Sequence, residues 1–186
     1  MRSTKSERMA RQKEPGILSQ NKTAVFICGA LLLLLLWQVF SAYHTLPEQV
    51  PAHFSFSGQP NRWMSRNLFL ILELVLIFFS GGSFCFLPLF FEKIPLGYIN
   101  LPNKEYWFTP ERKRETFVRI SAYLLWFGNA TLLFFYFLFG KIVAFAENTN
   151  RSLKLWPELL VYLLFVLIWS VRFFQEFSKR NRQKIG

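Results

Sequence analysis

The chain has 186 residues, of which 52% are hydrophobic and 19% aromatic, and its formal net charge is +11. Charged residues are only 18% of the chain, and the apolar residues gather in blocks of membrane length, which excludes an ordinary soluble domain. The basic residues flank these blocks and form no stripe on a soluble element, so we expect no nucleic-acid binding.

Residues 1–23 are polar and basic, and Pro15-Gly16 would interrupt any helix. This composition is typical of a mostly disordered tail, which we place in the cytoplasm. The first predicted span is Ala24–Tyr43. A signal peptide cut near Ser41-Ala42 is the alternative, but the basic region before the span is long and three further apolar runs follow, which favours a retained helix.

The three further spans complete a predicted membrane domain over residues 24–174, followed by a second basic tail at 175–186. They are predicted at Leu68–Phe91, Phe117–Phe145 and Leu159–Phe174. The second is interrupted by Ser80-Gly81-Gly82-Ser83, small residues that let helices approach closely. Pro88 follows within the same run and disfavours a regular helix there.

The numbers of lysine and arginine residues alternate along the chain. There are six in the N-terminal tail, two in the loop 44–67, six between residues 92 and 119, two in the loop 146–158 and five at the C-terminal end. Basic residues are enriched on the cytoplasmic side of membrane proteins. The pattern therefore predicts four spans with both termini in the cytoplasm, outer loops at 44–67 and 146–158, and an inner loop at 92–116.

Both cysteines, Cys28 and Cys85, lie inside apolar runs, and neither has a partner at C-x-x-C spacing. This disfavours a zinc site and a disulfide framework. We therefore expect the two side chains to act as small buried hydrophobic groups.

The first outer loop contains LPEQVPAHFSFSGQPNRW at residues 46–63, whose prolines prevent the preceding helix from continuing. We expect a short structured loop. Its sequence resembles LP-x-x-VP-x-HF-x-x-x-G-x-P-x-x-W, the motif of the membrane proteins grouped as domain of unknown function 1648, which are related to SdpI-like immunity proteins. INLPNKEYWFTPER, at residues 99–112, is similar to a second motif of that family. The resemblance implies a multi-spanning protein of the bacterial plasma membrane.

Four residues of the outer loop are our candidates for contact with an extracellular ligand, peptide or protein partner. They are His53, Phe54, Gly58 and Trp63. In the competing interpretation they are structural: His53 fixes the turn by a hydrogen bond, Gly58 supplies a positive φ, and Trp63 anchors the loop at the membrane boundary.

A third interpretation makes His44, Glu48 and His53 the ligands of a metal-dependent membrane enzyme. Three ligands without tight spacing are a poor match to known zinc sites. No nucleophile elbow, phosphate-binding loop or Ser/His/Asp combination occurs in the sequence. We therefore expect no catalytic residues, no metal, no cofactor and no enzymatic activity.

Two ionisable residues lie inside predicted spans, Glu73 in the second and Lys141 in the third. Both lie at a similar depth below the outer ends of their helices, so we expect an intramembrane ion pair. A proton- or ion-coupled transporter component built on these two residues is the alternative. Four spans are few for a transporter, so that alternative requires a homo-oligomer.

The inner loop carries the second motif, in which we expect a site for a cytoplasmic partner at Asn100, Pro102, Asn103, Tyr106 and Trp107. The neighbouring basic cluster, Arg112, Lys113 and Arg114, is expected to contact anionic lipids. The sequence thus predicts an all-α integral membrane protein with four transmembrane helices. Its expected role is that of a non-enzymatic sensor, accessory or immunity-like protein.

Overall fold

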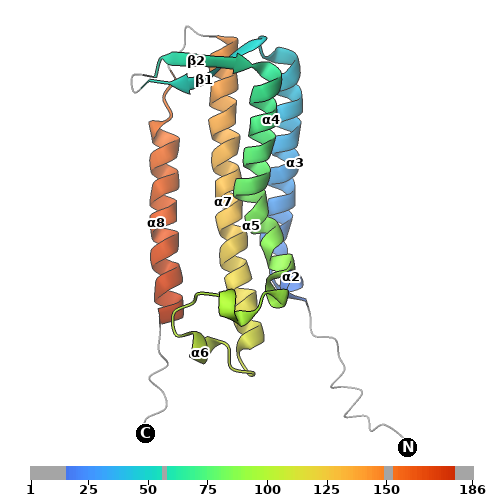
Figure 1. Cartoon of the computed structure of the whole chain (residues 1–186), viewed down its shortest axis with the longest axis vertical. Coiled ribbons are helices and arrows are strands. Elements are labelled where there is room, and N and C mark those ends of the chain that lie inside the picture. Colours follow the sequence, from blue (N-terminus) through green and yellow to red (C-terminus); the bar gives the residue numbers. More distant parts are fainter. Residues whose placement is uncertain (1–15, 56–57, 149–152, 179–186) are drawn as a thin grey trace, which may run out of the picture.

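The structure is a computed structural model of the chain and describes residues 16–55, 58–148 and 153–178. Four long helical segments lie side by side, with a β-hairpin at one end and residues 16 and 178 at the other (Figure 1). We call these the hairpin end and the terminal end. The segments are α3 (Lys22–Thr45), Arg66–Leu89, α7 (Lys113–Glu147) and α8 (Trp156–Ser178).

Each of these four segments is long and apolar enough to cross a membrane. They contain the first, third and fourth predicted spans and extend each by a few residues at both ends, whereas the second segment begins two residues before the predicted span and ends two residues before its predicted end. The protein is therefore mostly helical, as predicted for a multi-pass membrane protein, and residues 16 and 178 lie at the same end of the bundle, as an even number of spans requires.

The second span is not one regular helix. It consists of α4 (Arg66–Leu76), the π-helical turn η1 (Ile77–Gly82), the short helix α5 (Ser83–Phe86) and the 3₁₀ turn η2 (Leu87–Leu89). The irregular part coincides with the predicted interruption at residues 80–83 and with Pro88, which removes one helical donor. Ser83 Oγ also bonds the Phe79 carbonyl, 2.7 Å away, inside this stretch.

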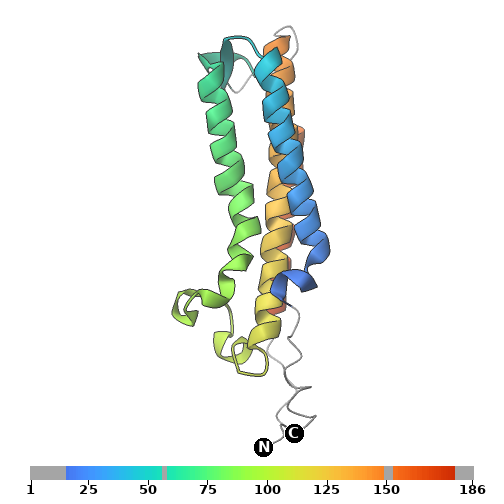
Figure 2. The ribbon, with the colours of Figure 1, turned by 90° about the vertical axis from the view of Figure 1, so that its right-hand side faces the viewer.

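This irregular part lies against α7, which it contacts through η1 and α5 (Figure 2). Gly81 faces Leu132 of α7 so closely that an added Cβ would overlap the leucine side chain. Small residues are a known means of bringing membrane helices together. The predicted packing role of residues 80–83 is therefore visible at Gly81.

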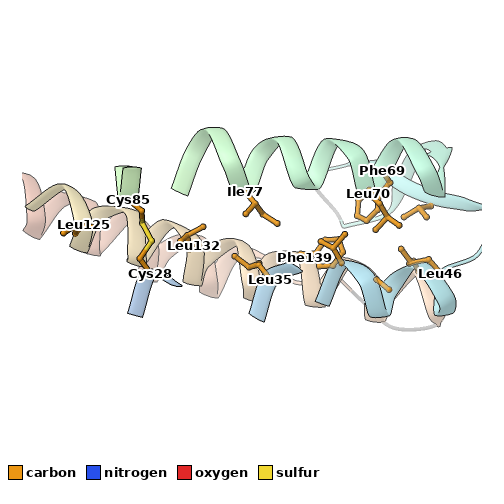
Figure 3. Close-up of a cluster of buried hydrophobic side chains, with 14 of the residues drawn as sticks. Cys28, Leu35, Leu46, Phe69, Leu70, Ile77, Cys85, Leu125, Leu132 and Phe139 are labelled. Atoms are coloured by element: carbon orange, nitrogen blue, oxygen red, sulfur yellow. A yellow bond between two sulfur atoms is a disulfide. The ribbon is translucent and has the colours of Figure 1, made fainter. Parts of the chain in front are cut away.

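Buried hydrophobic side chains from α3, the second span and α7 form the main core, which runs along the bundle axis (Figure 3). Leu35, Leu132 and Phe139 are fully buried in it. The rings of Phe69 and Phe139 stack with their centroids 5.7 Å apart. This core positions the hairpin, because it continues upward to Leu46 and Val50.

Cys28 and Cys85 form a disulfide that joins α3 to α5 near the terminal end, with their Cα atoms 6.5 Å apart (Figure 3). The prediction of two unpaired cysteines was therefore wrong. The first two spans run in opposite directions, so residues 57 positions apart return to the same depth, which no local spacing pattern reveals. Asn129 of α7 lies beside the bond and donates to the Ala24 carbonyl, 2.9 Å away.

Part of each predicted tail is helical. Helix α2 (Ile17–Gln20) precedes α3, and Ile17 is buried in a second hydrophobic cluster at the terminal end. The side-chain amide of Asn21 donates to the Val118 carbonyl of α7, 3.3 Å away. At the other tail α8 continues to Ser178. The prediction of a mostly disordered tail is thus wrong for residues 16–23, whereas residues 1–15 and 179–186 lie outside the described part.

Helix α8 lies to one side of the bundle and packs mainly against α7 (Figure 1). Aromatic residues form this contact: the rings of Phe134 and Tyr162 stack 4.5 Å apart, and the Trp169 indole donates to the Tyr123 carbonyl over 3.1 Å. Phe177 is the buried residue of α8. The attachment of α8 therefore depends on aromatic contacts spread along the helix and on the burial of Phe177 at its end.

The outer-loop motif forms two antiparallel strands, β1 (Gln49–Phe54) and β2 (Pro60–Ser65). The prediction of an all-α fold was wrong in this respect. Valine, phenylalanine and tryptophan in the motif favour strands, and Gly58 supplies the turn. The register changes on both sides of His53, which lies opposite Arg62.

Candidate functional site

The hairpin is fastened to the ends of the helices by its inward-facing side chains. Val50 is fully buried and Leu46 nearly so. The ring of Phe54 meets that of Phe145, near the end of α7, edge to face with centroids 5.5 Å apart. The hairpin is therefore a fixed part of the bundle surface.

Arg66, the first residue of α4, ties both sides of the hairpin together. Its Nη1 donates to the Leu46 carbonyl over 3.0 Å, and its backbone N–H donates to the Glu48 carbonyl over 2.9 Å. Its guanidinium also lies 4.7 Å from the centre of the Tyr43 ring. Arg66 lies outside the motif at residues 46–63, so the motif gave no indication of this role.

His53 is held by a hydrogen bond across the hairpin. Its Nδ1 lies 2.5 Å from Oδ1 of Asn61, so the bond requires the proton on Nδ1, because the amide oxygen can only accept. The contact fits the structural interpretation, in which His53 fixes the turn. The residue is nevertheless exposed, so its predicted contact with a ligand stays a prediction.

Gly58 lies at the tip of the hairpin with φ at 81°, a conformation that residues with a side chain rarely adopt. Its N–H donates to the Ser55 carbonyl over 2.9 Å. An added Cβ would lie only 2.8 Å from the carbonyl oxygen of Leu153, which precedes α8. Glycine therefore permits both the turn and the contact between the hairpin and the α8 connection.

A hollow of about 490 Å³ opens between the hairpin tip and the beginning of α8. Its walls come from two predicted outer loops that are about a hundred residues apart in the sequence. The described lining residues are Phe54, Ser55, Gly58, Leu153, Lys154, Leu155, Trp156 and Leu159. We refer to this feature as the tip hollow.

The tip hollow contains two of the four predicted outer-loop residues, Phe54 and Gly58. Trp63 lies on β2 opposite Pro51, and 49% of its surface is exposed. The wall formed by residues 153–159 was missed by the sequence analysis. The one sequence signal for a contact between this segment and the hairpin was that both were predicted on the same side of the membrane.

The three proposed metal ligands do not come together. His44 lies within α3 and packs edge to face against Phe40 and Tyr43, whereas His53 is bound to Asn61. Across the described residues, no group of three histidine, cysteine or acidic side chains could hold a metal ion. The described geometry therefore gives no support to a metal site built on His44, Glu48 and His53.

Lys141 does not pair with Glu73. Its Nζ lies 2.5 Å from Oε1 of Glu158, in the first turn of α8, and also donates to the Lys154 carbonyl over 2.9 Å. The predicted ion pair was wrong because the Lys141 side chain projects from α7 toward α8, away from α4. The pair instead fastens the hairpin end of α8, directly beside the tip hollow.

At the terminal end, the second motif binds the last turn of α8. The Trp107 indole donates to the Phe177 carbonyl over 2.9 Å, and the Asn103 amide donates to the Ser178 carbonyl over 3.0 Å. The last carbonyls of a helix have no partner within it, so these donors supply one. The rings of Trp107 and Phe177 also meet edge to face, 5.2 Å apart. We call this contact the α8 clamp.

The α8 clamp is braced from α7. The Thr116 hydroxyl donates to the Trp107 carbonyl over 2.8 Å, at a position that is fully buried. Arg119 forms ion pairs with Glu115 of its own helix and with Glu176 of α8. Asn103 adopts a left-handed backbone with φ at 51°, which asparagine tolerates better than most residues.

The other inner-loop candidates lie around the α8 clamp without contributing to its described hydrogen bonds. Asn100 is exposed and Pro102 half-buried, and Tyr106 lies edge to face against the Trp107 ring. The Arg112 guanidinium lies 4.1 Å from the centre of the Tyr106 ring. The role of this motif in binding a cytoplasmic partner stays a prediction.

Arg112, Lys113 and Arg114, the residues at the beginning of α7, form a basic group at the terminal end. Lys113 Nζ lies 5.9 Å from the centre of the Phe117 ring, and Arg112 stacks on Tyr106. Long basic side chains commonly bury their stems this way and keep the charge at the membrane interface.

Searches of curated proteins and of solved structures found no match to the chain. One family model does match, over residues 29–78, a stretch that contains most of α3, the whole hairpin and α4. This match confirms the resemblance carried by the outer-loop motif, and the relation to SdpI-like proteins stays a prediction. The chain contains, at residues 29–78, a domain of unknown function 1648 (DUF1648).

Proposed function

We propose that the protein is a non-enzymatic sensor or accessory protein of the bacterial plasma membrane that binds an extracellular peptide at the tip hollow. In this proposal both termini are cytoplasmic, as the alternation of basic residues predicts. The observation that carries the proposal is the tip hollow itself, whose two walls are the DUF1648 hairpin and the beginning of α8.

The size and lining of the tip hollow suit a peptide side chain. Its volume of about 490 Å³ falls within the range of small-ligand pockets, roughly 300–1,000 Å³. Phe54, Trp156 and Leu159 offer apolar surface, and Lys154 offers a cation at the rim. Aromatic side chains with few charges are typical of surfaces that bind peptides.

Helix α8 provides a physical connection from this hollow to the opposite end of the bundle. Trp156 and Leu159 lie in its first turns, and Phe177, held by the α8 clamp, lies in its last turn. A helix of 23 residues is about 34 Å long. A peptide that displaced Trp156 would therefore shift a rigid element whose other end is bound by the second motif.

In this proposal the terminal end of the bundle transmits peptide binding to the cytoplasm. The basic group Arg112, Lys113 and Arg114 adjoins the clamp and would hold this end against anionic lipid, each charge contributing about 1 kcal/mol. In this proposal the exposed inner-loop residues recruit a cytoplasmic partner when the clamp loosens. An immunity-like role would be one form of the same recognition, with a toxic peptide as the ligand.

Site-specific photocrosslinking in cells tests the proposal. A photoreactive phenylalanine analogue at position 156 or 159 should yield a peptide adduct, and the identified peptide should bind purified wild-type protein. Phe54→Ala should weaken that binding at least tenfold. The matched control is the analogue at Leu167, which is exposed on α8 far from the hollow and should label lipid only. Equal adducts at all three positions would refute recognition at the tip hollow.

A further inference from the structure

Glu73 points into the core of the bundle from α4. Only 7% of its surface is exposed. It lies three or four residues from Phe69, Leu70 and Ile77, which are the neighbours on one face of a helix and are all buried (Figure 3). Among the described residues, Oε1 of Glu73 has no hydrogen-bond partner.

Gln38 presents a second unsatisfied acceptor from α3. Its Nε2 donates to the Tyr136 carbonyl of α7 over 3.3 Å. Gly140 leaves space for this amide, because an added Cβ would lie 2.9 Å from Nε2. Within the part of the chain that the structure describes, Oε1 of Gln38 is buried without a partner.

The two acceptors lie at the same depth on adjacent antiparallel helices. Gln38 is seven residues from the end of α3 at Thr45, and Glu73 is seven residues from the beginning of α4 at Arg66. Each is therefore about 10 Å from the hairpin end of its helix. Both side chains belong to the inward face, since Gln38 follows the buried Leu35 by three positions and precedes the buried Ala42 by four.

The described cations near α4 are occupied elsewhere. Arg66 binds the Leu46 carbonyl and the Tyr43 ring, and Lys141 binds Glu158. The other titratable side chains on the elements that pack against α4 belong to α3, the hairpin and α7, whose Phe139 stacks on Phe69. On α3 and the hairpin they are Lys22, Tyr43, His44, His53 and Arg62, which lie near the helix ends or in the strands. On α7 they are Lys113, Arg114, Glu115, Arg119, Tyr123, Tyr136 and Glu147, of which Tyr136 packs partly buried against the same core. None of these described groups forms a hydrogen bond with Oε1 of Glu73.

We propose that Glu73 is a proton-binding site within the membrane-spanning part of the bundle, and that its neutral carboxyl group donates a hydrogen bond to Oε1 of Gln38. A buried carboxylate without a cation or donor is very unfavourable, and so is a buried amide oxygen without a donor. One bound proton removes both penalties, because a protonated carboxyl group has an O–H donor and Gln38 Oε1 can accept it.

A backbone hydrogen bond connects Glu73 to the irregular part of the second span. The Ile77 N–H, at the beginning of η1, bonds to the carbonyls of both Glu73 and Leu74. The Glu73 carbonyl therefore accepts a hydrogen bond from the first residue of the π-helical turn, an irregularity frequently found at functional sites. Loss of the proton would place a charge one helical turn before η1.

Infrared spectroscopy of the purified protein in lipid nanodiscs tests the proposal directly. The carbonyl stretch of a protonated carboxylic acid is separate from that of an ionised carboxylate. At neutral pH the wild type should show this band, and Glu73→Gln should lose it. The matched control, Glu92→Gln, removes an exposed carboxyl group and should keep the band.

A second variant keeps the test valid if Glu73→Gln does not fold. Gln38→Leu retains Glu73 but removes its proposed acceptor, so the band should persist and shift to the higher frequency of a carboxyl group without a hydrogen bond. Absence of the band from the wild type would overturn the proposal without any variant. An unshifted band in Gln38→Leu would overturn the assignment of Gln38. Neither result depends on peptide binding at the tip hollow.

Discussion

Trp107 donates its indole N–H to the backbone carbonyl of Phe177, 70 positions later in the chain, over a distance of 2.9 Å. This bond joins the second sequence motif to the last turn of the helix that packs least against the rest of the bundle. It gives a structural role to the tryptophan and to the asparagine with a left-handed backbone in this motif. The α8 clamp is thus the described structural role of the motif.

Trp107→Phe should loosen the terminal end of α8. The variant keeps the ring contact with Phe177 but removes the indole donor, which leaves the Phe177 carbonyl with the Asn103 amide, 3.4 Å away, as its remaining side-chain donor. The loss of one hydrogen bond of this kind costs about 0.5–1.5 kcal/mol. We expect a lower unfolding temperature in detergent and faster hydrogen exchange in the last turns of α8. Tyr98→Phe in the same loop is the control, since Tyr98 is 84% exposed, and it should leave both measurements unchanged.

Gly58→Ala should disturb the hairpin tip for two independent reasons. The backbone is in the left-handed region, and the new Cβ would meet the Leu153 carbonyl. Strain of this kind costs about 1–3 kcal/mol. Thermal unfolding of the variant should reveal the loss, and peptide binding should weaken with it. Gly97→Ala has open space around the new methyl group, so equal losses in both variants would contradict this account.

The disulfide predicts a specific result in alkylation experiments. The intact protein should take up no alkylating reagent after denaturation without a reductant, and two equivalents after reduction. Loss of the bond through Cys28→Ser should lower stability by up to roughly 4 kcal/mol for a closed loop of this length, and less if the unfolded helices remain inserted. Alkylation of the unreduced protein at both cysteines would show that the bond is absent.

A double-mutant cycle distinguishes the observed partner of Lys141 from the expected one. Lys141→Met and Glu158→Gln should show a coupling energy of about 0.2–1 kcal/mol, because the pair is partly exposed. Lys141→Met and Glu73→Gln should be additive, since these side chains face different helices. A coupling that appeared only with Glu73 would reverse the assignment.

The proposed orientation predicts opposite labelling of the two ends of the bundle. Trp63→Cys places a thiol on the exposed hairpin, and Tyr98→Cys places one on the exposed loop at the terminal end. A membrane-impermeant maleimide added to intact cells should label the first variant and not the second. The opposite pattern would place the hairpin in the cytoplasm and remove the basis for recognition of an extracellular peptide.

The long apolar blocks predicted the four helical spans correctly, because burial in a membrane requires a minimum length and an almost continuous apolar composition. The irregular stretch of the second span was also visible, since Gly81-Gly82 and Pro88 disrupt helical geometry locally. The four spans and the irregular stretch are both determined by the composition of short segments of neighbouring residues.

Two predictions about pairing were wrong for a common reason: the expected pair of Glu73 with Lys141, and the expectation that the two cysteines are unpaired. Depth in the membrane can be counted along a helix, and it placed Glu73 and Lys141 at similar heights. Depth says nothing about the direction in which a side chain leaves its helix, and Lys141 leaves α7 toward Glu158. The same lack of information hid the disulfide, although Cys28 and Cys85 lie at equal depth on antiparallel spans.

The sequence by itself determined which segments are apolar helices, where the second helix breaks and which loop carries the family motif, because these follow from local composition and turn chemistry. Only the tertiary structure decided that the outer motif is a β-hairpin whose tip shares a hollow with α8, and that the inner motif holds the last turn of the same helix. Such contacts depend on the rotation and packing of helices about one another, which side chains from the whole chain decide together.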